Sequence, residues 1–401
     1  MTAEVKFWAP DTLVIILTRN RPRTLRRCVN IALESIGIAD TLVILDDSDE
    51  WYVQENHAVL RNRTPRATPI VHMSTRDLLD MLKQYLPTSA LEWTNRMAQR
   101  DIAPIRNASL ILSKCFEAGH VLLVDDDIVG FDISVTRYWL TRLAQKYSNV
   151  VVGAHIGGLD ETDVISRITR GIKRACSCAN TESQSISVRE SFTVMPKADE
   201  MQRETEMVSG GYLSFRFTSG VTEPFPPGYN EDWLWCLSLQ SKRMASVFRI
   251  PQIVIHDPFV IRKPSENDLF FELRGDVALQ RELARYKTCK RASMPTARQS
   301  GEEWSTQQYD HDAPETWVKE LLTQAAEHGR ECGAFIANQF RAFGLKLIKR
   351  MYIEGRFHLD WNQEFDLWKA QSERNRNSFC EAMNNALTSD LVGSVIQKGK
   401  M

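Results

Sequence analysis

Short, uninterrupted apolar runs alternate with helical patterns through the first third of this chain of 401 residues. The run Leu13–Leu17 (LVIIL) is followed by Pro22, which suits the first turn of a helix, and by apolar positions at helical spacing. Similar apolar runs recur at 41–45, 70–73 and 121–124. Runs this short, without polar alternation, are typical of strands buried on both faces of a parallel sheet. The pattern therefore predicts an α/β fold with a doubly wound sheet, whose site lies at the carboxyl ends of the strands.

The rest of the chain is less regular. We expect strands at 150–154, 208–217 and 250–255, and helices at about 230–242 and 268–286. The stretch 177–206 is polar and poorly periodic, which indicates an insertion. These features predict one main domain over residues 1–270 and a mostly helical C-terminal region over 271–401, with a linker near 290–314.

Composition excludes several classes of protein. The 50 Lys and Arg residues nearly balance the 51 Asp and Glu residues, so net charge gives no general attraction to nucleic acid or anionic membranes. No apolar run approaches the roughly 20 residues that span a bilayer, and the first residues do not resemble a signal peptide. The eight cysteines are too irregular for a disulfide framework, and Cys176 with Cys178 provides only half a zinc site. We expect a reduced, cytoplasmic protein without an integral membrane segment.

Acidic residues gather where the apolar elements end. Asp46 and Asp47 follow the second predicted strand, Asp125–Asp127 follow the run at 121–124, and His256 ends the strand at 250–255. Asp46 and Asp47 alone fit a solvated loop or a helix cap as well as a site. Three consecutive carboxylates repel one another unless a cation neutralises them. Hard oxygen ligands of this kind favour Mg²⁺ or Mn²⁺ bound together with substrate phosphates.

Five segments of the chain, taken in order, resemble the motifs of GT-A-fold glycosyltransferases of the family 2 type, which use nucleotide-diphospho-sugars. They are VIILTRNRPRTLRRCV, VILDDSD, PIRNASLILSKCFEAGHVLLVDDDI with a DxD motif, GYNEDWLWCLSLQ with an ED motif, and IHDP. The resemblance covers about Thr12–Pro258. It implies a GT-A, Rossmann-like mixed sheet, with nucleotide-sugar binding in roughly 12–130 and the acceptor and catalytic base in roughly 150–260.

The resemblance also implies roles for individual residues. Those matching the nucleotide-sugar site are Thr18, Asn20, Asp46, Asp47, Arg106, Asp125, Asp126 and Gly211. Two of them have simpler alternatives, since Asn20 could merely cap the following helix and Arg106 could form a structural salt bridge. Either Asp46 or Asp47 would contact the nucleobase, and Gly211 would let the backbone approach donor or acceptor closely.

The implied metal is Mn²⁺ or Mg²⁺. Asp127 would contact it directly, Asp125 would bind the ribose or the metal through water, and His256 would complete the site unless it is structural. Asp126 replaces a commoner small or neutral residue, so the pair of carboxylates that points inward stays open. Asp232 matches the catalytic base of inverting members, and Glu231 would be the base instead or would orient the acceptor.

The expected activity is inverting transfer of a sugar from a nucleotide-diphospho-sugar, with a UDP-sugar favoured, to an unidentified acceptor hydroxyl. The alternatives are a retaining transferase, a nucleotidyltransferase on a similar sheet, or a non-catalytic sugar-nucleotide-binding module. LTRNRPRT lacks the glycine-rich loop expected of a nucleotidyltransferase. The acceptor classes left open are a small natural product, a lipid-linked sugar, a protein side chain and, as the only nucleic-acid option, a modified DNA base.

Two segments outside the motifs, 177–206 and 315–401, would shape acceptor choice, lid closure or homo-oligomerisation through the C-terminal helices. The stretch Gln339–Tyr352 is basic and amphipathic. It suits either a membrane-surface or anionic acceptor, or a helix packed on the main domain with solvated lysines.

Overall fold

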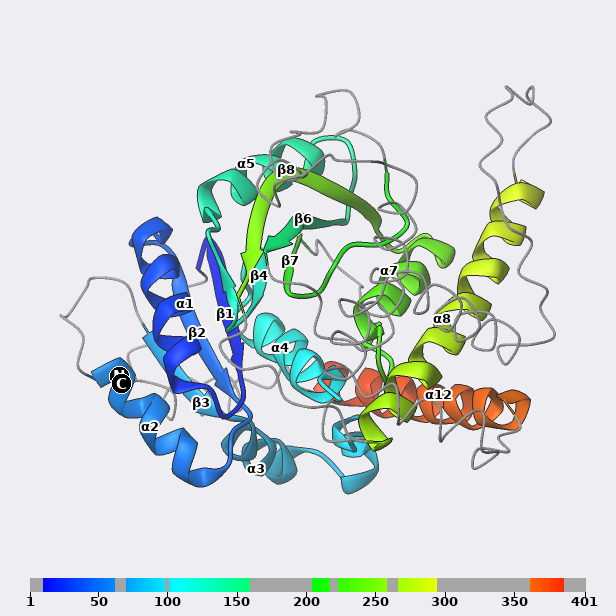
Figure 1. Ribbon diagram of the computed structural model, residues 1–401, viewed down its shortest axis with the longest axis horizontal. Helices are drawn as coiled ribbons and strands as arrows, with labels where there is room; N and C mark the ends of the chain where they lie inside the picture. The colour runs from blue at the N-terminus through cyan, green and yellow to red at the C-terminus, as the bar shows by residue number, and fades with distance from the viewer. Residues whose placement is uncertain are drawn as a thin grey trace, which may run out of the picture.

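The computed structural model describes residues 10–61, 70–97, 101–158, 204–216, 223–257, 266–293 and 361–385. Its centre is an eight-stranded mixed sheet with the strand order β3-β2-β1-β4-β7-β6-β8-β5 (Figure 1). The strands are β1 (Thr12–Thr18), β2 (Thr41–Asp46), β3 (Ile70–Ser74), β4 (His120–Asp125), β5 (Ile128–Val129), β6 (Val150–Gly158), β7 (Tyr212–Arg216) and β8 (Ser246–His256).

The first four strands of this order are parallel, and the sheet becomes mixed beyond them. β7 runs antiparallel to both β4 and β6, β6 pairs in parallel with β8, and the short β5 runs antiparallel to β8. The doubly wound sheet expected from the apolar runs and the mixed sheet that the resemblance implied are therefore confirmed. No helix in the described part of the chain is both long and apolar enough to cross a membrane.

The apolar run of β1 is buried on both faces of the sheet, as its unbroken pattern predicts. All seven residues of β1 are buried. Leu13 and Ile15 belong to the core on one face, whereas Val14 and Ile16 belong to the core on the other. Successive side chains point to opposite sides of a strand, so a strand packed on both sides must be apolar throughout.

Helices cover both faces of the sheet (Figure 1). One core contains residues of α1 (Pro22–Ser35), α2 (Glu50–Arg61) and α5 (Ile133–Ala144). The other contains residues of α3 (Thr75–Tyr85), the 3₁₀ helix η1 (Thr88–Thr94), α4 (Ala103–Cys115) and α7 (Glu231–Ser241). The sequence pattern did not predict α2, η1, α5 or β5. In α2 only Asn56 and Leu60 are buried, so its sequence carries little helical periodicity.

Two C-terminal helices pack against this main body. α8 (Glu266–Ser293) contacts α7, and α12 (Trp361–Asn385) contacts η1 and α4. The start of the linker expected near 290 falls inside α8, because this helix extends beyond the expected 268–286, and the boundary expected at 270 lies within the same helix. The Cys176–Cys178 pair, the stretch Gln339–Tyr352, most of 177–206 and the rest of the linker lie outside the described residues.

Candidate active site

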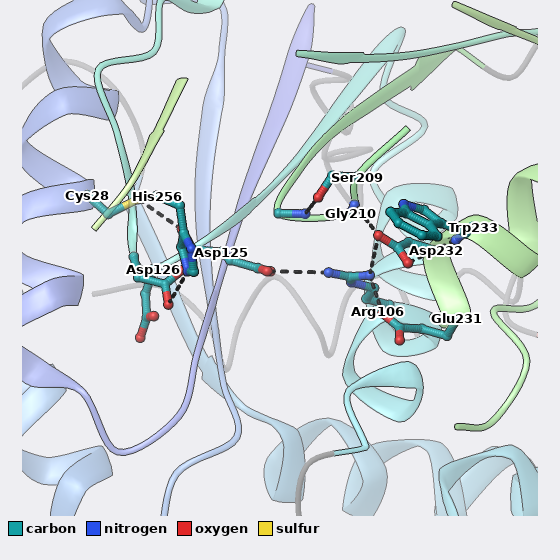
Figure 2. Close-up of polar contacts among 12 residues, drawn as sticks. Cys28, Arg106, Asp125, Asp126, Ser209, Gly210, Glu231, Asp232, Trp233 and His256 are labelled. Carbon is teal, nitrogen blue, oxygen red and sulfur yellow. Dashed lines mark hydrogen bonds and ion pairs between the residues drawn. The ribbon is translucent and has the colours of Figure 1, made fainter. Parts of the chain in front are cut away.

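The acidic clusters and their partners meet at one edge of the sheet. In the parallel register Thr18 lies beside Asp46, and Leu17 lies beside Asp125. The loops after β1, β2 and β4 therefore start at the same level, at the carboxyl ends of these strands. β8 brings His256 to this edge, because His256 pairs with Ile128 of β5 just after the aspartate triplet. The first turn of α7 brings Glu231 and Asp232 to the other side of the cluster (Figure 2).

Asp126 is directed into the protein. Its carboxylate accepts a hydrogen bond from the Thr18 hydroxyl at 2.6 Å and one from Arg21 Nη1 at 3.1 Å. The side chain is only 4% exposed. Burial raises the pKa of Asp126 to about 7, because its two partners compensate only part of the lost hydration. Asp126 is therefore the member of the triplet that is anchored to the loop after β1.

Asp127 lies between Arg21 and His256. Its Oδ2 atom is 2.5 Å from Arg21 Nη1 and 3.3 Å from His256 Nε2. Burial acts to raise the pKa of Asp127, but the hydrogen bond with His256 and the charge of Arg21 lower it below its ordinary value. Burial likewise acts to lower the pKa of His256, and the hydrogen bond with Asp127 raises it above its ordinary value. Asp127 and His256 thus each favour the charged form of the other.

The donor atoms of Asp127 and His256 are of the kind that a divalent cation binds. Within the described residues, no group of three or more His, Cys, Asp or Glu side chains is arranged to hold a metal ion. Asp127 and His256 do approach one another closely enough to ligate one ion together. Mg²⁺ and Mn²⁺ commonly take only one or two protein ligands and complete their shell with water and substrate phosphates. The pair fits such a substrate-completed site, provided that Arg21 leaves the shared Asp127 oxygen.

Arg106 of α4 connects the aspartate triplet to α7. Its guanidinium is 2% exposed, contacts Glu231 through Nη1 and lies 3.3 Å from Asp125 Oδ2 through Nη2 (Figure 2). Asp232 Oδ2 lies 4.0 Å from the same Nη1 atom. One buried cation thus serves three carboxylates on two elements. A salt bridge between exposed side chains would not hold three carboxylates around one cation. The shared, buried guanidinium fixes the distances between these acids.

Glu231 and Asp232 are adjacent in sequence but have different surroundings. Glu231 is buried against Arg106, and burial raises its pKa to about 8. Asp232 is 14% exposed at its side chain. Its Oδ2 accepts a hydrogen bond from Gly210 N at 2.5 Å, and its Oδ1 accepts one from Trp233 N at 2.9 Å. The more accessible Asp232 can therefore meet an incoming molecule, while Glu231 serves as the buried partner of Arg106.

The paired glycines let the backbone fit closely around this network. A Cβ atom on Gly210 would collide with the Arg106 guanidinium. The carbonyl of Gly211 accepts a hydrogen bond from Asp125 N at 2.9 Å, and a Cβ on Gly211 would lie 3.5 Å from Asp125 Oδ2. The lack of a side chain at Gly210 lets the segment before β7 lie against the site.

Asp46 and Asp47 differ in their partners. Asp46 is fully buried and accepts hydrogen bonds from Asn56 Nδ2 at 2.9 Å and Ser48 N at 3.0 Å, with His72 Nε2 also at 2.9 Å. Asp47 accepts a hydrogen bond from Thr75 Oγ1 at 2.8 Å and pairs with Arg96. Asp46 therefore holds together buried side chains behind the end of β2. Asp47 is the member of the pair that contacts residues of the surrounding loops.

Asn20 joins two loops. Its backbone has a left-handed φ of 57°, its N–H donates to Ser48 Oγ at 2.7 Å, and its side chain exchanges two hydrogen bonds with Asp49. The N-cap residue of α1 is Arg21. Asn20 thus does not cap this helix, and it instead ties the loop after β1 to the loop after β2.

Arg21 and Arg96 contact predicted site residues but were not expected from the sequence. Arg21 precedes Pro22 at the start of α1, and arginines at such positions are usually solvated. Arg96 lies in a stretch without recognisable periodicity.

A cavity of about 490 Å³ beside α2 and β3 is lined by His57, Arg61 and His72 among others, and by none of the predicted site residues.

No known family model matches this chain, and no curated protein matches it. Similar solved structures include the mannosyltransferase PcManGT from Pyrobaculum calidifontis in complex with GDP-Man and Mn²⁺, at 11% identity, 92% coverage of this chain, 87% of that chain and a TM-score of 0.43. Glucosyl-3-phosphoglycerate synthase from Mycobacterium tuberculosis, in complex with Mn²⁺, UDP-glucose and phosphoglyceric acid, has 12% identity, coverages of 69% and 80%, and a TM-score of 0.39. TarS 1-349 from S. aureus, in complex with UDP-GlcNAc, has 12% identity, coverages of 92% and 92%, and a TM-score of 0.39. Because identity and structural overlap are both low, the assignment of function rests on the side chains of the site.

Proposed function

We propose that this chain is a metal-dependent, inverting glycosyltransferase that uses a nucleotide-diphospho-sugar, with a UDP-sugar as the favoured donor. The observation that carries the proposal is the Arg106 network. It holds Asp125, at the end of β4, and the Glu231–Asp232 pair, at the start of α7, on one guanidinium. A donor-side carboxylate and a candidate base thus lie at the same sheet edge, as transfer between two substrates requires.

The residues around the donor would divide the work by location. The half of the domain at roughly 12–130 would bind the nucleotide, with Thr18, Asn20 and Asp47 lining the loops that follow β1 and β2. The half at roughly 150–260 would bind the acceptor and carry the base. The C-terminal region would support this domain rather than bind the nucleotide.

Asp232 is the proposed general base. It would accept the proton of the acceptor hydroxyl as that oxygen attacks the anomeric carbon opposite the leaving nucleoside diphosphate. Both of its oxygens receive backbone N–H groups, which fix the carboxylate, and its side chain retains access to solvent. Glu231 would keep Arg106 in place, consistent with its burial.

Asp127 and His256 would hold Mn²⁺ or Mg²⁺, with Asp125 contributing directly or through water. The cation would offset the negative charge that develops on the leaving diphosphate. Arg21 occupies the Asp127 oxygen and would have to turn away, which its half-exposed side chain permits.

A panel of UDP- and GDP-sugars tests the proposal. We expect hydrolysis or transfer of at least one donor with Mn²⁺, loss of that activity with EDTA, and recovery after Mn²⁺ is added again. The anomeric configuration of the product, followed by NMR, distinguishes inversion from retention. Unchanged turnover in EDTA would exclude the metal site, and a retained configuration would exclude Asp232 as the base of an inverting reaction.

A further inference from the structure

The segment Pro227–Asn230 leads directly into Glu231 and Asp232 and has an unusual backbone. Gly228 has a φ of 113° and Asn230 has a φ of 62°, both outside the range that side-chain-bearing residues prefer. Conformations of this kind persist where surrounding contacts hold them. The contacts that hold this segment therefore bear on the position of the proposed base.

The C-terminal helix α12 supplies the first of these contacts. Trp368 Nε1 donates a buried hydrogen bond to the carbonyl oxygen of Pro227 at 2.7 Å. Its indole ring also faces Gly228, where an added Cβ would lie 3.4 Å from Nε1. Trp368 is 5% exposed and stacks on Phe365, with 5.6 Å between ring centroids. A neighbour on the same helix thus holds the indole in the orientation in which it contacts Pro227 and Gly228.

Helix α8 supplies the second set of contacts. Asn230 Nδ2 donates to Asp276 Oδ1 at 2.7 Å. Gly275 lies against the Tyr229 backbone so closely that a Cβ atom there would collide with the Tyr229 carbonyl. Figure 1 shows α7, α8 and α12 together on one side of the molecule. Both helices that contact Pro227–Asn230, α8 and α12, follow the part of the chain that carries the five motifs.

We infer that Trp368 is a positioning residue for Asp232, an inference that rests on the proposed function. Trp368 acts through the backbone of Pro227 and Gly228 and does not touch the reacting atoms. Its hydrogen bond sets the start of α7 so that Asp232 receives the Gly210 N–H at 2.5 Å and lies 4.0 Å from Arg106. Displacement of a catalytic group by about 1 Å can cost as much as 100-fold in rate, so a distant anchor of this kind affects turnover.

The test compares two conservative variants at the same helix, Trp368→Phe and Trp93→Phe. Trp93 also packs on α12, edge-to-face with Phe379, but within the described residues its indole N–H has no hydrogen-bond partner. Both substitutions shorten a buried aromatic side chain, and only Trp368→Phe removes a hydrogen bond to the segment before the base. Thermal unfolding of both proteins controls for a general loss of stability.

We measure kcat and KM for the nucleotide sugar that the donor panel identifies, and amide hydrogen exchange in peptides covering residues 223–236. Trp368→Phe should lower kcat about 3- to 30-fold, leave donor KM within about twofold, and speed exchange in these peptides. Trp93→Phe should leave kcat and the exchange of these peptides near wild type.

Three results would overturn the inference. They are unchanged kcat in Trp368→Phe, unchanged exchange at 223–236, and an equal loss of kcat in both variants. Wild-type protein without turnover of any nucleotide sugar would overturn the proposed function and this role with it. Active wild-type protein with an unaltered Trp368→Phe variant would overturn the inference alone.

Discussion

At the scale of single residues, a change at Asp232, the proposed base, tests catalysis separately from donor binding. Asp232→Asn keeps the size of the side chain, and its single amide oxygen can still accept one of the two N–H groups, of Gly210 and Trp233, that the carboxylate accepts. It removes the proton acceptor, which is typically worth roughly 10²- to 10⁴-fold in rate. We expect a loss of kcat in that range with nucleotide affinity unchanged by calorimetry. An Asp232→Asn enzyme as fast as wild type, still forming an inverted product, would remove Asp232 from the mechanism.

Glu231 makes the stability of the protein depend on pH. Burial raises its pKa from about 4.5 to about 8, because one Arg106 guanidinium cannot compensate three buried or half-buried carboxylates. Between these values the folded protein keeps a proton that the unfolded chain releases. The free energy of unfolding contributed by Glu231 is therefore fully present below about pH 4.5 and is lost as pH rises through about 8.

Denaturation of wild type and Glu231→Gln between pH 5 and 9 measures this contribution. The neutral Gln retains an oxygen for Arg106, so the variant should lose stability less steeply as pH rises, by at most about 1.4 kcal/mol per pH unit. Its kcat should fall less than that of Asp232→Asn. Parallel stability curves for the two proteins would contradict the raised pKa of Glu231.

Arg21 would compete with the proposed metal ion for Asp127. Its guanidinium contacts both Asp126 and Asp127, so removing its charge frees an oxygen and deepens the negative potential. Because Arg21 is 48% exposed at its side chain, solvent screens much of the effect. Arg21→Gln should tighten Mn²⁺ binding, measured by electron paramagnetic resonance without nucleotide, about threefold to tenfold. Arg142→Gln, which removes an exposed arginine beside Tyr138, should leave Mn²⁺ affinity unchanged.

At the scale of elements, Glu223 fastens α12 to α7. Its carboxylate lies 2.5 Å from Lys242 Nζ, 2.7 Å from Ser238 Oγ and 3.1 Å from Arg376 Nε, and its side chain is 8% exposed. Glu223→Gln should lower the free energy of unfolding by about 1–3 kcal/mol in urea titrations. Arg376→Gln should cost less than about 1 kcal/mol, because Arg376 is half-exposed. Equal losses in the two variants would contradict a central role for the Glu223 carboxylate.

The elements that sequence reasoning recovered are those with a strong local signal. The start of α1 follows from Pro22, and β1 follows from five consecutive apolar residues. The insertion of β7 between β4 and β6 depends on pairing across long sequence distances and has no local signal. Arg21 was missed for the same reason, since 106 residues separate it from Asp127.

The candidate site was more predictable than its supports. The acidic turns after β2 and β4 can be recognised in the sequence because each directly follows a buried strand. The register of the parallel strands then brings these turns together. Trp368 could not be anticipated, because a tryptophan in an amphipathic helix is normally read as core packing. Only its indole N–H, directed to Pro227, distinguishes it from such a residue.

At the scale of the whole molecule, donor binding should appear as thermal stabilisation. A ligand that binds only the folded state stabilises it by about 2.7 kcal/mol at 100 times its Kd. We expect UDP to raise the unfolding temperature with Mn²⁺ present and to do so much less in EDTA. Asp127→Ala should abolish the Mn²⁺-dependent part. A shift with UDP that is the same in Mn²⁺ and EDTA would show that the nucleotide binds without the metal.

The packing of α12 on η1 has a consequence for synthesis of the protein. The backbone N–H of Trp93 donates to Ser378 Oγ across 285 residues, and Phe379, Ala382 and Met383 complete the core on that face of the sheet. The ribosome must therefore have made nearly the whole chain before this face can close. A product that stops before α12 leaves apolar side chains of η1 and α4 exposed, which favours aggregation or degradation. Molecules that avoid aggregation and degradation have therefore been translated past residue 383.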